Sequence, residues 1–72
     1  MSKKITITNN IRKLRFAANE MTQNDLAQKV GASRQTIIAV EAGKYTPSLE
    51  LAFRIADALN ATINEVFECV AS

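Results

Sequence analysis

The chain has 72 residues, which fits one small domain, and 47% of them are hydrophobic, which excludes a disordered composition. A single cysteine excludes an intrachain disulfide framework, and no apolar run approaches the roughly 20 residues of a membrane span, so we expect a cytoplasmic protein with no membrane partner. Eight Lys and Arg against three Asp and Glu give residues 1–45 a net charge of +5, whereas one against four gives residues 46–72 a net charge of −3. Ordinary scatter could produce this difference, but it also suits a basic half that faces a polyanion.

The first predicted elements are a short strand and a helix. In the N-terminal KITIT, isoleucines alternate with polar residues, and this period of two indicates a strand. Thr8 or Asn9 can then cap a helix that is expected to run to about Asn19. Ile11 and Leu14 form the inward stripe of this helix.

The next helix, TQNDLAQKV, has recognisable signals at both ends. Thr22 can cap it, and Asp25 three residues later completes a capping box near the positive end of the helix dipole. Gly31 follows the helix and can adopt the positive φ that often ends one. One face of the helix is apolar and consists of Leu26, Ala27 and Val30.

The third and fourth helices are delimited in a similar way. Ser33 caps the third helix and Gly43 ends it. Thr46 followed by Pro47 predicts the start of the fourth helix, because proline at the first helical position loses no hydrogen bond. Helical spacing then predicts an inward stripe of Leu49, Ala52, Ile55, Ala56 and Leu59.

A short fifth helix and a tail complete the chain. Thr62 and Glu65 form a capping box for a helix that contains Val66 and Phe67. The N-terminal strand could pair with the tail near Cys69, which would tie the two ends of the chain together. For Cys69 itself we expect an ordinary buried thiol rather than a redox switch.

The spacing of residues 22–43 matches a helix-turn-helix. Two helices that cross steeply through a turn of three or four residues need hydrophobic side chains to fill the wedge between them. Ala27 must be small because the third helix passes close to it, and Gly31 allows the sharp turn. An ordinary helical bundle would match one of these constraints by chance, but rarely all of them. Counted from Gln23, the wedge positions are Leu26, Val30, Ala32, Ile37 and Val40.

The run TQNDLAQKVGASRQTIIAVEAGKYTPSLELAFRIADALN, followed by INEVF, resembles the lambda-repressor-like or Xre helix-turn-helix family over about residues 9–68. The resemblance implies an all-α, compact five-helix domain with the helix-turn-helix at its second and third helices, which binds operator DNA, usually as a symmetric dimer. We therefore expect one domain over residues 1–72, with an extended N-terminal arm at 1–8. Residues 46–72 hold the last two helices and the tail, which we expect to form the dimerisation region.

The start of the third helix is expected to read bases. Arg34 and Gln35 lie opposite the buried stripe, and the N-terminal residues of such a helix enter the major groove. The arginine fork matches guanine, and the glutamine amide matches adenine. Ile38 could touch thymine methyl groups or close over the stem of Arg34. Ala39 is too short to hydrogen-bond a base and permits close approach instead.

Contacts with the DNA backbone are expected around this helix. Gln23 begins the second helix, where free N–H groups attract phosphate, and the resemblance implies the same role. Further candidates for phosphate contacts are Ser33, Thr36, Lys44 and Tyr45. Lys44 could equally be a solvated lysine beside a helix C-terminus. The resemblance also implies a pair between Arg15 and Glu41 that orients the third helix, although two unpaired surface charges would look the same in the sequence.

Dimerisation is expected because operator specificity usually requires two copies about one helical turn apart. Phe53 falls off the main apolar stripe of its helix and is the better interface candidate. Phe67 could belong to the core or to the interface. Val70 in the tail is a third candidate, because strand pairing at the two ends of the chain would extend the dimer surface.

The sequence therefore predicts a sequence-specific transcriptional regulator, most often a repressor, that binds a palindromic operator in double-stranded DNA as a homodimer. An antitoxin or a restriction-modification controller would share the fold, and an adaptor domain would use the helices for protein contacts only. We expect no enzyme, because the chain has no histidine, no glycine-rich phosphate loop and no metal-ligand cluster. No catalytic residue, metal ligand or cofactor is predicted.

Overall fold

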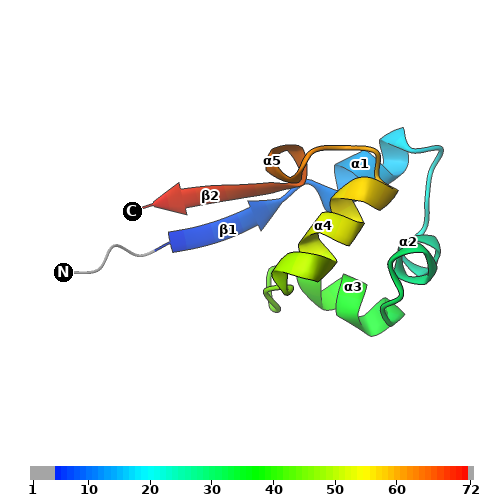
Figure 1. Ribbon diagram of the computed structural model, residues 1–72, viewed down its shortest axis with the longest axis horizontal. Helices are drawn as coiled ribbons and strands as arrows, with labels where there is room; N and C mark the ends of the chain where they lie inside the picture. The colour runs from blue at the N-terminus through cyan, green and yellow to red at the C-terminus, as the bar shows by residue number, and fades with distance from the viewer. Residues whose placement is uncertain (1–4, 72) are drawn as a thin grey trace.

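The computed structural model describes residues 5–71, which form five helices and two strands (Figure 1). Residues 1–4 of the expected arm and residue 72 lie outside the described part of the chain. The elements in order are β1 (Ile5–Asn9), α1 (Ile11–Ala17), α2 (Gln23–Val30), α3 (Arg34–Glu41), α4 (Leu49–Ala58), α5 (Ile63–Val66) and β2 (Phe67–Ala71). The five-helix fold and the pairing of the terminal strands, both expected from the sequence, are confirmed.

Each helix contributes one fully buried side chain to a single core. Ile11, Leu26, Ile37, Ile55 and Val66 come from α1 to α5 in turn, and each is 0% exposed. Burying an aliphatic side chain of this size contributes about 1.5–3 kcal/mol, so these five residues fix how the helices meet. The other buried hydrophobic residues are Ala27, Val30, Val40, Ala52, Ala56 and Leu59.

Capping hydrogen bonds set the starts of α2 and α5 where the sequence predicted them. Thr22 Oγ1 accepts from the backbone N–H of Asp25 (3.0 Å), and Asp25 Oδ2 accepts from the backbone N–H of Thr22 (3.1 Å). That second bond lowers the pKa of the Asp25 carboxyl below its ordinary value of 3.8. Thr62 and Glu65 form the same reciprocal pair at α5.

The predicted start of α4 is wrong by two residues. Ser48, not Thr46, caps the helix, and its Oγ accepts from the backbone N–H of Leu51 (3.2 Å). Serine caps a helix at least as well as threonine, and this start also places Glu50 in the first turn, where the helix dipole favours an acid. The first residue of α4, Leu49, is 71% exposed and does not belong to the inward stripe.

Helices α1 and α5 are both shorter than predicted. Asn10 occupies the cap position of α1, while the side chain of Asn9 accepts from the backbone N–H of Ile11 (3.2 Å). Helix α1 ends before Asn19, whose backbone is left-handed with φ 62° and cannot continue a helix. Phe67 has an extended backbone and begins β2 instead of ending α5.

Strands β1 and β2 form an antiparallel ribbon that projects away from the helices (Figure 1). Ile7 pairs with Cys69 and Thr6 with Val70. Directly opposite residues share a face of a sheet, so Ile7 and Cys69 lie on one face and Thr6 and Val70 on the other. Because the ribbon leaves the helical body, Cys69 is exposed, and the expectation of a buried thiol is wrong.

Candidate nucleic-acid interface

Helices α2 and α3 form the predicted helix-turn-helix. Gly31 ends α2 in a left-handed conformation with φ 73°, and the backbone N–H of Ala32 donates to the carbonyl of Ala27 (3.0 Å). Ala27 is 2% exposed, in agreement with the need for a small residue where the helices pack closely. Of the wedge residues Leu26, Val30, Ala32, Ile37 and Val40, all are buried except Ala32, which is half-buried against the core.

Helix α3 separates a buried stripe from an exposed polar tip. Ile37 and Val40 are buried, whereas Arg34 and Gln35 are exposed, as the sequence predicted. Ile38 is 40% exposed. The helix therefore presents an arginine fork, a glutamine amide and an apolar branched side chain to the solvent.

A serine cap fixes the first turn of α3. Ser33 Oγ accepts from the backbone N–H of Thr36 (3.1 Å), and the two hydroxyl groups are hydrogen-bonded to each other (2.8 Å). Both hydroxyls predicted to reach phosphate thus already take part in the cap. Ala39, which is expected to permit close approach, is half-buried.

Arg15 and Glu41 form the predicted ion pair, and both side chains are largely buried rather than on the surface. Arg15 Nε lies 2.6 Å from Glu41 Oε2, and Nη2 donates to Oε1 at 3.1 Å, with the two side chains only 9% and 10% exposed. Arg15 Nη1 also donates to the carbonyl of Met21 (2.8 Å). The guanidinium therefore links α1, the loop before α2 and the end of α3.

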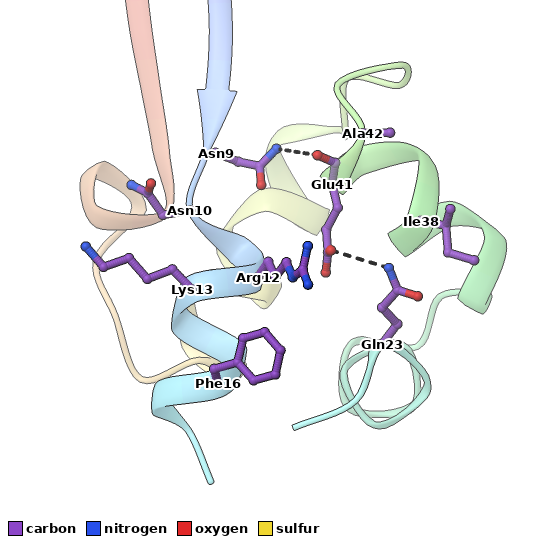
Figure 2. A pocket seen from close by; sticks show the side chains of 9 residues that line it. All are labelled: Asn9, Asn10, Arg12, Lys13, Phe16, Gln23, Ile38, Glu41 and Ala42. Carbon is purple, nitrogen blue, oxygen red and sulfur yellow. Dashed lines mark hydrogen bonds between the residues drawn. The ribbon is translucent and has the colours of Figure 1, made fainter. Parts of the chain in front are cut away.

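Two amides join this network around Glu41 (Figure 2). Gln23 Nε2, from the first residue of α2, donates to Glu41 Oε1 (3.3 Å). Asn9 Nδ2, from the end of β1, donates to the backbone carbonyl of Glu41 (3.3 Å), which is the bond drawn in Figure 2, and to the carbonyl of Val40 (3.0 Å). Helix α3 is thus held by polar contacts from β1, α1 and α2. This role of Asn9 could not be predicted from local sequence, because its partner Val40 lies 31 residues away.

The remaining predicted residues occupy the surface at several places. Lys44 and Tyr45 follow α3 and are exposed, Tyr45 by 49%. Phe53 on α4 is 54% exposed and Val70 on β2 is 52% exposed, so both are available for contact with another chain. Phe67 is half-buried and packs against the core, which favours the core alternative for this residue.

The part of the chain that the structure describes shows two further features. No helix in it is long and apolar enough to cross a membrane. Its side chains also contain no cluster of three or more potential metal ligands among His, Cys, Asp and Glu.

Comparison with known proteins agrees with this geometry. A sequence model of the helix-turn-helix family matches residues 11–66. An uncharacterized HTH-type transcriptional regulator of Methanocaldococcus jannaschii is 57% identical over 51 residues, which are 71% of this chain and 77% of the relative. A Bacillus subtilis protein of the same description, YgzD, is 41% identical over 59 residues, or 82% of this chain and 88% of the relative.

A solved structure has the same fold. The crystal structure of a Bacteroides fragilis protein, which carries the provisional name of a DNA-binding protein, superimposes with a TM-score of 0.74 at 27% identity. The match covers 86% of this chain and 98% of the other. From the family match, the relatives and the α2–turn–α3 geometry together, the chain belongs to the lambda-repressor-like (Xre) helix-turn-helix family.

Proposed function

We propose that this protein is a transcriptional regulator that binds double-stranded DNA in a sequence-specific manner by inserting α3 into the major groove. The observation that carries the proposal is the division of α3 into a buried stripe, Ile37 and Val40, and an exposed tip, Arg34 and Gln35. A helix anchored on one side with such a tip can reach base edges without moving the domain.

The chemistry of the tip supports base readout. Arginine can donate two hydrogen bonds to guanine O6 and N7, and glutamine can pair with adenine N6 and N7. Each good bidentate contact is worth about 1–3 kcal/mol of discrimination against a wrong base. The buried Arg15–Glu41 pair and the Asn9 contact support this role, because a fixed helix keeps the tip at a defined angle.

We further propose that the protein acts as a homodimer on a palindromic operator and represses transcription by covering promoter DNA. A single helix contacts few base pairs, and two-fold symmetry doubles the site. Exposed hydrophobic side chains on β1, α4 and β2 support this assembly. They are Ile5, Ile7, Leu49, Phe53 and Val70, which are 60%, 48%, 71%, 54% and 52% exposed. We propose that the protein works in the cytoplasm and catalyses no reaction.

Selection of binding sites from random double-stranded oligonucleotides tests this function. The proposal predicts an enriched palindrome whose half-site centres lie about 10 base pairs, or a multiple of this, apart. Sedimentation analysis of the protein with the selected duplex should show two chains on one operator. Failure to enrich any sequence at low salt would refute DNA recognition and favour an adaptor that contacts proteins only.

A further inference from the structure

Beside α3, two surface hollows share Phe16 and Gln23. The first lies between α1 and α3 and is also lined by Arg12, Ile38 and Glu41 (Figure 2). The second is lined by Arg34 and Glu20 in addition to the shared residues. Together they form a track, which we call the α1 track, from Arg12 past Phe16 and Gln23 to the base-reading tip at Arg34.

The α1 track contains an exposed aromatic ring, Phe16, that lies close to two arginines. Phe16 is 52% exposed, although it lies on a helix that buries Ile11 completely. The guanidinium carbon of Arg12 is 5.6 Å from the ring centroid, and that of Arg15 is 5.8 Å away. Cations at this distance are attracted to the face of an aromatic ring. The attraction to the ring therefore favours a conformation in which the Arg12 guanidinium lies in the track beside Phe16.

The charge of the track is positive where Arg12 lies. The two ion pairs in the described chain are Arg15–Glu41 and Arg54–Glu50, so Arg12 is left without a carboxylate partner. The charge of Glu41 is already offset by the Arg15 guanidinium, and its carboxylate also accepts a hydrogen bond from the neutral amide of Gln23. Lys13 adds a second cation at the edge of the first hollow. Glu20 is the unneutralised acid of the track, and it lies at the far hollow, away from Arg12.

The dimensions of DNA place a phosphate backbone beside this surface. The major groove is about 12 Å wide, and a helix with its side chains measures about 10–12 Å across. A strand backbone must therefore pass close to each flank of an inserted α3. The elements on one flank are α1 and the start of α2, which carry the track.

We propose, on the basis of the function proposed above, that the α1 track binds the sugar-phosphate backbone of one operator strand. Arg12 donates charge-assisted hydrogen bonds to a phosphate, and the exposed ring of Phe16 packs on the neighbouring deoxyribose. A phosphate matches the unpaired guanidinium better than a neutral partner does. Arg12 is then a positioning residue that sets the depth and angle of α3 without reading a base.

The salt dependence of operator binding tests this proposal. Each phosphate contact contributes about 0.9 to the slope of log K against log salt concentration. Arg12→Ala should therefore flatten the slope by about one unit per protomer and leave the preferred sequence unchanged, and Arg12→Lys should restore most of the slope. Lys29→Ala is the matched control, because Lys29 is an exposed cation of α2 that lines neither hollow of the track.

Neutral methylphosphonate substitution locates the contact. The operator phosphates are replaced one at a time. At one position the replacement should weaken binding by the wild-type protein, whereas the affinity of Arg12→Ala should be the same with and without that replacement. Equal slopes for Arg12→Ala and Lys29→Ala would overturn the proposal, as would a methylphosphonate profile that the Arg12 variant leaves unchanged. Thermal melts of both variants exclude unfolding as the cause. If the wild-type protein selects no DNA at all, the proposed function itself is refuted, which is a different result.

Discussion

Removing the carboxylate of Glu41 should destabilise the whole domain, because it leaves the Arg15 guanidinium buried without a counter-charge. The Arg15 side chain is only 9% exposed, so water cannot replace the lost partner. Breaking a buried pair from one side costs about 3–5 kcal/mol. A chain of 72 residues has a total stability of about 4–11 kcal/mol, so Glu41→Ala should remove a large part of it.

The expected change is large enough to measure in a thermal melt. For a domain of this size, 1 kcal/mol shifts Tm by about 4–8 °C, so Glu41→Ala should lower Tm by about 12–40 °C. The double variant Arg15→Met/Glu41→Leu removes both charges and should recover most of that loss, because apolar residues can replace a buried pair at little cost. The coupling energy follows from four proteins, the wild type, Arg15→Met, Glu41→Leu and the double variant, each measured by circular dichroism at 222 nm during heating and by urea titration.

Additive effects of the single substitutions would refute this reasoning. So would a loss below about 1 kcal/mol for Glu41→Ala, which is the value of an exposed pair. Glu50→Ala is the matched control, because Glu50 pairs with Arg54 on the surface, where the side chains are 73% and 56% exposed. That variant should change Tm by no more than a few degrees.

Four further predictions concern single residues. Arg34→Ala should weaken operator binding by about 1–3 kcal/mol and reduce the base preference at one position of each half-site. Repeating the oligonucleotide selection with this variant measures that preference. Lys44→Ala should weaken binding to all DNA sequences alike. It should also flatten the slope of log K against log salt concentration by about one unit per protomer. Leu26→Ala should cost about 2–5 kcal/mol in urea unfolding, because Leu26 is 0% exposed. Because the pKa of Asp25 is lowered in the fold, its stabilising contribution is present at neutral pH and is lost as pH falls below the ordinary value of 3.8. As pH is lowered from neutral to below this value, the free energy of unfolding should therefore fall less for Asp25→Asn than for the wild-type protein.

Local signals explain why the helix-turn-helix could be predicted from the sequence. The caps Thr22 and Ser33 and the left-handed Gly31 act on residues within four positions of themselves, so the sequence alone contains both partners. The spacing of Ile37 and Val40 then determined which face of α3 is buried and which face carries Arg34.

Features that depend on distant contacts could not be predicted in the same way. Asn9 contacts Val40 across 31 positions, and no pattern near Asn9 marks it. The exposure of Cys69 depends on the ribbon leaving the helical body, and the α1 track depends on α1 lying beside α3. At the start of α4, two acceptable caps lie two residues apart, and the sequence did not decide between Thr46 and Ser48.

An NMR titration of the isotope-labelled protein with its selected operator duplex tests the central claim most directly. The claim predicts that backbone and side-chain signals of Arg34, Gln35 and Ile38 shift most, with further shifts at Gln23 and Lys44 on the flanks. Signals of exposed α4 residues that face away from DNA, such as Asp57, should remain where they are at saturation. Shifts confined to α4 and the β1–β2 ribbon, with the tip of α3 unchanged, would contradict the claim that α3 enters the major groove.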